Sequence, residues 1–184
     1  MKEIINEEMD NIFQLTDYTQ WEPYLNRDLV KCHYELHHLQ YVKNLKNQNI
    51  FSFEHVINNM QNYTQSQINN ALQIHNHNVF WQSMKIHNWE NKMDLPLKEF
   101  ELAANTVFGS GWVWLVQDRQ DYHVIPLITK DAQIPDTSKY QILLTLDLWE
   151  HAYYLQYYAS RKEFINVFVN HLINYEYIEK NLMK

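Results

Sequence analysis

Residues 143–157 read LLTLDLWEHAYYLQY and hold the most informative pattern in the chain. Residues 142–146 form a short run of β-branched and other apolar residues that is typical of a strand. Asp147 follows this run directly, and His151 comes four residues later. If the chain turns at Trp149, the carboxylate and the imidazole can face one point. The pattern therefore predicts a metal site with one oxygen and one nitrogen ligand.

Histidine is abundant, with ten residues among 184. The histidines gather in three places: His33, His37 and His38; His75, His77 and His87; and His151. A single histidine on an apolar helix face is usually a packed residue, so the clustering matters more than the number. Three neutral nitrogens and one carboxylate suit iron or manganese. A structural zinc site would prefer thiolates, and the sequence has only one cysteine.

The N-terminal half is predicted to be helical. Asn26 is a favourable N-cap for a helix that extends to about residue 47. Six of its residues recur at spacings of three and four and should share one face: Leu29, Val30, His33, Leu36, His37 and Tyr41. Ser52 can cap a short helix through residue 60, and residues 64–85 fit a further helix.

The C-terminal half changes character after an expected loop at residues 86–97. Three runs rich in β-branched and aromatic residues, at 112–117, 122–129 and 142–146, predict an antiparallel three-stranded sheet. Helices are predicted at 97–107, 149–158 and 162–182. The chain is therefore predicted to be α+β, with an N-terminal helical domain over residues 1–85 and a C-terminal α+β domain over residues 86–184.

Glycine occurs only twice, at Gly109 and Gly111. Asparagine and glutamine are abundant and can serve other turns. A sequence that avoids glycine elsewhere should keep it where the backbone requires it. We therefore expect a special turn or a close packing point in residues 108–112.

Composition argues against several classes of function. The net charge of -7 disfavours nucleic acid as a partner. The longest apolar runs are too short to span a bilayer, so no membrane partner is expected. The acidic start, MKEIINEEMD, does not resemble a targeting signal, and Cys32 is the single cysteine. We therefore expect a cytoplasmic protein.

Four segments in order resemble the iron and manganese superoxide dismutase family: KCHYELHHLQYV (31–42), NNALQIHNHNVFW (69–81), FGSGWVWLV (108–116) and residues 143–157. The resemblance implies conversion of superoxide to dioxygen and hydrogen peroxide at one metal ion per subunit. The ligands that it implies are His33, His77, Asp147 and His151. The family pattern NH-x-x-x-W selects His77, because Trp81 follows it. His75 lies two positions earlier and would point roughly 200° away on a helix.

The resemblance also implies residues around the ligands. Tyr41 matches the gateway tyrosine, and His37 lies between it and His33. Trp81, Trp112 and Trp149 match an aromatic shell. Gln73 matches the glutamine of the iron type. The manganese type takes its glutamine from the loop before the last strand, where counting back from Asp147 reaches Ala132 rather than Gln133. We therefore expect iron, with manganese as the other metal of the family.

The resemblance further implies a homodimer. Glu150 would bridge to the partner subunit's His151, and Tyr154 would meet the partner subunit's His37. Arg161 matches an arginine that attracts the superoxide anion in the family. The chain departs from the family in the short interval between His77 and Phe108.

Two alternatives remain open at the level of the sequence. One is a structural or interaction protein with a dismutase-like fold and no turnover, such as a ribosome-associated subunit. The other is a different non-haem iron oxidoreductase, although such enzymes commonly use two histidines and one carboxylate.

Overall fold

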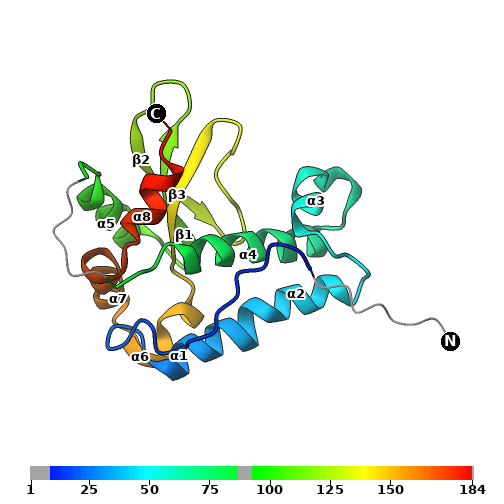
Figure 1. The fold of residues 1–184 in the computed structure, drawn as a ribbon, viewed down its shortest axis with the longest axis horizontal. Helices are drawn as coiled ribbons and strands as arrows, with labels where there is room; N and C mark the ends of the chain where they lie inside the picture. Colours follow the sequence, from blue (N-terminus) through cyan, green and yellow to red (C-terminus); the bar gives the residue numbers. More distant parts are fainter. Residues whose placement is uncertain (1–8, 87–92, 184) are drawn as a thin grey trace.

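A helical hairpin joined to an antiparallel sheet makes up the computed structural model, which describes residues 9–86 and 93–183 (Figure 1). The N-terminal half contains α1 (Arg27–Lys31), the π-helical segment η1 (Cys32–His38), α2 (Leu39–Lys46), α3 (Phe53–Asn58), the 3-10 turn η2 (Met60–Asn62) and α4 (Gln65–Gln82). The first three run on without a break and pack against α4.

The three helix starts predicted in the N-terminal half are confirmed, and each has a side-chain cap. Asn26 accepts a hydrogen bond from the Leu29 amide, and Ser52 accepts one from the His55 amide. Thr64 and Gln67 cap each other's backbone at the start of α4 as a capping box. These local bonds satisfy amides that the first helical turn leaves free, which is why the starts are readable from sequence.

The predicted apolar face of the first helix is wrong at one position. Leu36 is 71% exposed, because residues 32–38 adopt a π-helix and not a regular α-helix. In a π-helix the backbone hydrogen bonds join residues five apart, so the side chains that point inward follow a different spacing from that of an α-helix. His33 and His38 are both buried as a result, and the spacing of three from His33 to Leu36 no longer marks one face.

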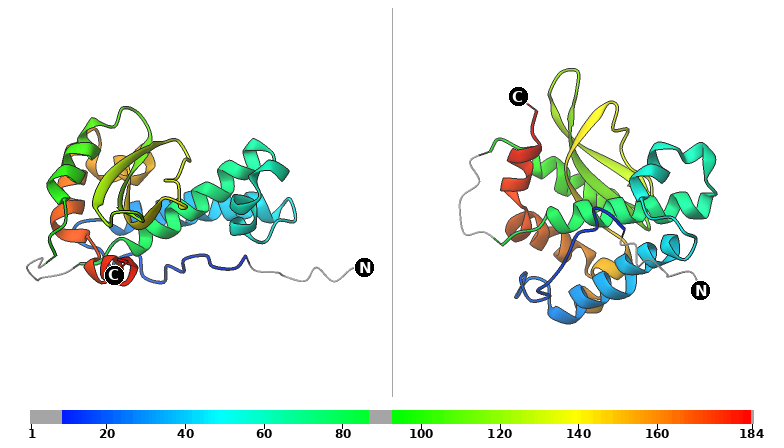
Figure 2. Two further views of the ribbon diagram at one scale, coloured as in Figure 1. Left: turned by 90° about the horizontal axis from the view of Figure 1, so that it is seen from above. Right: turned by 45° about the vertical axis from the view of Figure 1, so that its right-hand side comes forward.

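The sheet has the order β2-β1-β3 and is antiparallel throughout, as predicted. Its strands are β1 (Gly111–Asp118), β2 (Val124–Lys130) and β3 (Tyr140–Asp147). Trp112 at the start of β1 pairs with Asp147 at the end of β3. The helix α5 (Leu97–Thr106) contacts β1 and β2, while α4 contacts β3. Figure 1 and Figure 2 show α4 running between the sheet and the α1–α2 segment.

The single helix predicted over residues 162–182 is wrong. The structure has α7 (Arg161–Val167), a π-helical segment η4 (Phe168–Leu172) and α8 (Tyr175–Asn181). Ile173 leaves the helix to form a β-bridge with Met84, and Asn174 caps α8 through the Tyr177 amide. The helix predicted over 149–158 is also broken, into the 3-10 turn η3 (Glu150–Ala152) and α6 (Tyr154–Tyr157).

Both glycines occupy positions that need them, as predicted. Gly109 has a φ of 73°, in the left-handed region that suits glycine. A Cβ on Gly111 would lie 2.6 Å from the Thr129 carbonyl oxygen of β2. The close approach of β1 to β2 therefore depends on the missing side chain.

The α+β class is confirmed. Within residues 9–86 and 93–183, no helix is long and apolar enough to cross a bilayer. Half of the expected loop at residues 86–97, residues 87–92 with His87, lies outside the described residues.

Candidate metal centre

Four side chains from separate parts of the chain converge between the two halves of the molecule. His33 comes from η1, His77 from α4, Asp147 from the end of β3 and His151 from η3. One ligand atom from each lies within 4.8 Å of those of the others. The Asp147 Oδ2 atom lies 3.3 Å from His33 Nε2, 3.6 Å from His77 Nε2 and 3.1 Å from His151 Nε2. The structure thus brings together the four residues that the sequence predicted as ligands.

Two backbone contacts orient the inner ligands. The Trp149 amide donates to Asp147 Oδ1 at 2.9 Å, which turns the other carboxylate oxygen toward the histidines. His77 Nδ1 lies 2.7 Å from the Gln73 carbonyl oxygen, so this nitrogen carries the proton and Nε2 keeps its lone pair. Contacts of this kind are what fix a metal-ligating imidazole in the correct tautomer.

The protonation states also suit metal binding. Burial lowers the pKa of His33 to about 4 and that of His77 well below its usual value. Burial alone would raise the pKa of Asp147, but its interactions with His151 and His33, which include a hydrogen bond with His151 Nε2, hold that pKa well below the usual range. His33 and His77 are therefore neutral imidazoles and Asp147 is an ionised carboxylate, the forms that bind a metal ion.

A metal ion would also resolve an otherwise unfavourable feature of the centre. His33 Nε2 and His77 Nε2 are fully buried and have no hydrogen-bond partner. A buried polar atom without a partner is costly, and both atoms point at the space beside Asp147. Ligand atoms this close together match a common bond length of about 2 Å to one ion. The donor set fits iron or manganese in its chemistry.

Aromatic rings surround the four side chains. Ring-centre distances are 4.7 Å from His33 to Trp81, 5.1 Å from His77 to Trp112 and 5.8 Å from His151 to Trp149. Trp81 and Trp112 are buried. Removing water in this way strengthens every electrostatic interaction inside the centre.

His37 and Tyr41 lie on the more open side of the centre. The Tyr41 hydroxyl is hydrogen-bonded to His37 Nε2 at 2.9 Å, and both residues are half-buried. The His37 ring centre lies 3.6 Å from that of His151. The pair therefore links the ligand set to the solvent side of α2.

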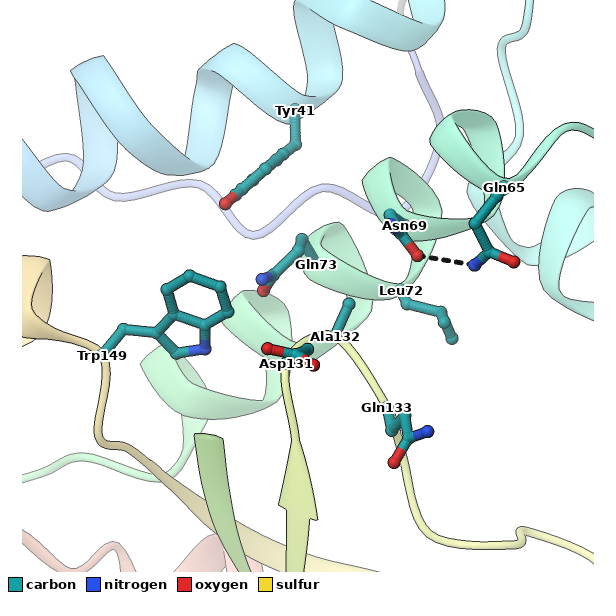
Figure 3. A pocket seen from close by; sticks show the side chains of 9 residues that line it. All are labelled: Tyr41, Gln65, Asn69, Leu72, Gln73, Asp131, Ala132, Gln133 and Trp149. Atoms are coloured by element: carbon teal, nitrogen blue, oxygen red, sulfur yellow. Dashed lines mark hydrogen bonds between the residues drawn. The ribbon is translucent and has the colours of Figure 1, made fainter. Parts of the chain in front are cut away.

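Gln73 lines a pocket of about 520 Å³ together with Tyr41, Trp149 and Ala132 (Figure 3). Its amide points between Tyr41 and Trp149, and its Oε1 atom is buried without a partner. Ala132 is buried and presents no polar side chain at this place. Gln133 is exposed, and its side chain points away from Gln73.

The remaining predicted residues lie outside the ligand group. Glu150 and Tyr154 are exposed. Arg161 donates hydrogen bonds to the carbonyl oxygens of Val107 and Gly109, so it fastens the loop before β1. His75 is separate from the ligand group and lines another pocket, beside Arg119.

Sequence reasoning gave no role to His38, although it noted the histidine cluster. His38 is fully buried and accepts a hydrogen bond from the Trp81 indole at 3.1 Å. Its inward direction follows from the π-helical turn, because His38 lies five residues after His33. The regular period of an α-helix does not predict that His38 points inward.

Comparison with known proteins gives matches over both halves. The family described as iron/manganese superoxide dismutases, alpha-hairpin domain, matches residues 13–85, and that described as iron/manganese superoxide dismutases, C-terminal domain, matches residues 82–181.

Three relatives match nearly the whole chain. A Synechocystis protein named superoxide dismutase (Fe) is 34% identical over 90% of this chain and 94% of its own length. A Leptolyngbya boryana protein of the same name is 36% identical over 88% and 92%. A Rickettsia bellii protein named superoxide dismutase (Mn/Fe) is 32% identical over 89% and 88%.

Proposed function

The chain belongs to the iron/manganese superoxide dismutase family, and from this premise we propose that it converts superoxide to dioxygen and hydrogen peroxide. His33, His77, Asp147 and His151 would hold one metal ion per subunit. The observation that carries the proposal is the convergence of their four ligand atoms within 4.8 Å. Iron or manganese, when bound, supplies the one-electron chemistry that oxidises one superoxide and reduces the next.

Tyr41 and His37 would supply protons to the departing peroxide. Their hydrogen bond joins the half-buried gateway to the ligand His151 through the His37 ring. Burial raises the pKa of the Tyr41 hydroxyl well above its usual value, and the charge of Asp147 adds to this effect. The hydroxyl therefore keeps its proton at neutral pH and is available as a donor.

Gln73 would orient a solvent molecule at the centre. Its side-chain amide has a free buried oxygen and lies beside Tyr41 and Trp149. Hydrogen bonds from residues outside the ligand set tune the reduction potential of a metal centre. On the loop before β3, Ala132 occupies the position from which the manganese type would supply its glutamine, and the Gln133 side chain points away. This arrangement supports the iron type.

Metal reconstitution tests the assignment. The metal-free protein, loaded separately with each metal, should be highly active with iron and little active with manganese. Peroxide should inactivate the iron form, because ferrous iron and peroxide generate an oxidant beside Trp81 and Trp149. Equal activity with both metals would instead identify a site that accepts either, and peroxide-resistant activity with manganese alone would overturn the iron assignment.

We also propose a homodimer formed around the mouth of the centre. Glu150 would bridge to the partner subunit's His151, and Tyr154 would meet the partner subunit's His37. Tyr154 and Leu155 are 49% and 53% exposed, which supports an interface here.

The free, exposed thiol of Cys32 supports a reducing compartment, and we propose the cytoplasm. We further propose that residues 1–85 and 86–184 form the two domains.

The alternative functions are less well supported. A structural protein with this fold would have no need of the buried, unpartnered Nε2 atoms of His33 and His77. A two-histidine iron site would not use the third histidine, His151. Metal analysis combined with an assay of superoxide removal separates the three functions, and absence of both metal and activity would favour the structural protein.

A further inference from the structure

A line of aromatic side chains leads from the metal centre toward the protein surface, and the proposed reaction does not use it. The His33 ring centre lies 4.7 Å from Trp81, Trp81 lies 5.9 Å from Tyr34, and Tyr34 lies 6.4 Å from Tyr18. Tyr34 and Trp81 are buried, whereas Tyr18 is half-buried and reaches solvent. Electron transfer between aromatic rings is fast at contact distance, since its rate falls exponentially with separation.

The inner end of this line is suited to losing an electron. Trp81 stacks on Trp21 with ring centres 5.6 Å apart and planes 17° apart, so a positive charge can spread over two indoles. The Trp81 N–H donates to His38 Nδ1 at 3.1 Å, which stabilises positive charge on the indole. Both indoles are buried and line one pocket.

The two tyrosines differ in what accepts their hydroxyl proton. Tyr34 donates to the Phe13 carbonyl oxygen, which cannot take up a proton. Tyr18 donates to a Glu35 carboxylate oxygen at 2.7 Å, and a carboxylate can. The Glu35 side chain is 36% exposed, so it can pass the proton to water. Of the two tyrosines, Tyr18 is thus the one that can lose its proton together with an electron and form a neutral radical.

We propose that Trp81, Tyr34 and Tyr18 form a relay that carries oxidising equivalents away from the metal centre to the surface. The inference rests on the proposed function, because hydrogen peroxide is the oxidant. Cleavage of the peroxide O–O bond takes up two electrons, one from ferrous iron and one from Trp81, and yields two hydroxide ions. Trp81 regains its electron from Tyr18 through Tyr34, and Tyr18 gives its proton to Glu35. A soluble one-electron reductant of the thiol or ascorbate class then restores Tyr18.

The first test follows the radical in the iron-loaded protein. The reduced protein is mixed with peroxide and frozen, and electron paramagnetic resonance is recorded. The native chain should give a tyrosyl radical signal that Tyr18→Phe loses and Glu35→Gln strongly diminishes. Peptide mass spectrometry should show oxidation moved onto Trp81 in both variants, and peroxide should inactivate them several-fold faster.

Tyr122→Phe is the matched control, because Tyr122 is an exposed tyrosine between β1 and β2, outside the relay. The radical signal, the oxidation at Trp81 and the rate of inactivation by peroxide should be the same in Tyr122→Phe as in the native chain. An unchanged radical signal and unchanged oxidation at Trp81 in Tyr18→Phe would overturn the relay.

A second arm separates the relay from the proposed function. Azide radicals made by pulse radiolysis oxidise tryptophan without any metal chemistry. In the native chain the tryptophanyl absorption should decay as a tyrosyl absorption grows, and Tyr18→Phe should slow this step several-fold. Equal rates of this electron transfer in both proteins would overturn the relay, independently of any chemistry at the metal centre. Transfer with azide radicals but no radical with peroxide would keep the route and overturn its peroxide-driven role, together with the proposed iron chemistry.

Discussion

The inner and outer sides of the metal centre are built differently. His33, His77 and Asp147 are at most 2% exposed and come from long elements that pack against one another. The outer side consists of His151, whose side chain is 19% exposed, and the half-buried Tyr41. The comparison indicates a division of roles. We propose that the inner side binds the metal ion and supplies the ionised carboxylate, whereas the outer side supplies protons and forms the subunit interface.

The largest expected effect is loss of an inner ligand. His77→Ala should abolish tight metal binding and activity, because it removes a nitrogen whose lone pair is fixed toward Asp147. Two measurements test this prediction: the metal content after dialysis and the rate of superoxide removal. The matched control is His75→Ala on the same helix, which should retain the metal. Loss of metal in the control but not in His77→Ala would reverse the assignment.

The next effect is at Gln73, on the border between the two sides. Gln73→Ala should keep the metal but lower activity by about 10–100-fold, the usual cost of removing a residue that orients groups around a metal. Activity per bound metal ion is the measurement. Gln133→Ala should leave activity unchanged, because its side chain points away from the pocket. A loss in Gln133→Ala with none in Gln73→Ala would place the functional amide on the loop before β3.

A smaller effect is expected at the outer surface. Glu150→Ala should weaken subunit association and lower activity together, because the exposed carboxylate would bridge to the partner subunit's His151. Sedimentation velocity and activity at matched protein concentrations measure the two effects. Glu179→Ala, an exposed glutamate on α8, is the control. A fully active monomer of Glu150→Ala would show that this interface is wrong.

The smallest expected effect on function is at Gly111, which supports the inner side through the sheet. Gly111→Ala should cost about 1–3 kcal/mol of stability, because its Cβ would meet the Thr129 carbonyl oxygen. Each kcal/mol corresponds to about 2–4 °C in Tm for a chain of this size. Calorimetry should show the loss, with activity per folded, metal-loaded protein retained. Gly109→Asn is the comparison variant, because its side chain would meet open space and only the positive φ would cost stability, which asparagine tolerates better than most residues; it should lose less stability than Gly111→Ala. An equal loss in both variants would contradict the role of the close approach.

Most elements could be predicted from sequence because their signals are local. The caps at Asn26, Ser52 and Thr64 bind amides within their own first turn. The strand ending at Asp147 is a continuous apolar run because both faces of that part of the sheet are covered. Such patterns depend on neighbours in the chain and therefore appear in the printed sequence.

The errors arose where distant contacts override local preference. The break after η4 exists because Ile173 pairs with Met84, far away in the sequence. Leu36 turns outward and His38 inward because η1 widens into a π-helix beside α4. A helical period assumes one regular geometry, so it cannot anticipate either change.

Residue type and spacing in the sequence by itself determined the α+β class and the need for both glycines, and the resemblance of four segments to a known family supplied the candidate ligands. Only the tertiary structure decided that His33, His77, Asp147 and His151 share one buried point with unpartnered nitrogens. It alone decided that Gln73 faces the pocket and Gln133 does not, and that Tyr18 meets Glu35 beside Tyr34. The physical reason is that these relations depend on how separate elements pack, and packing fixes directions that spacing along one chain leaves open.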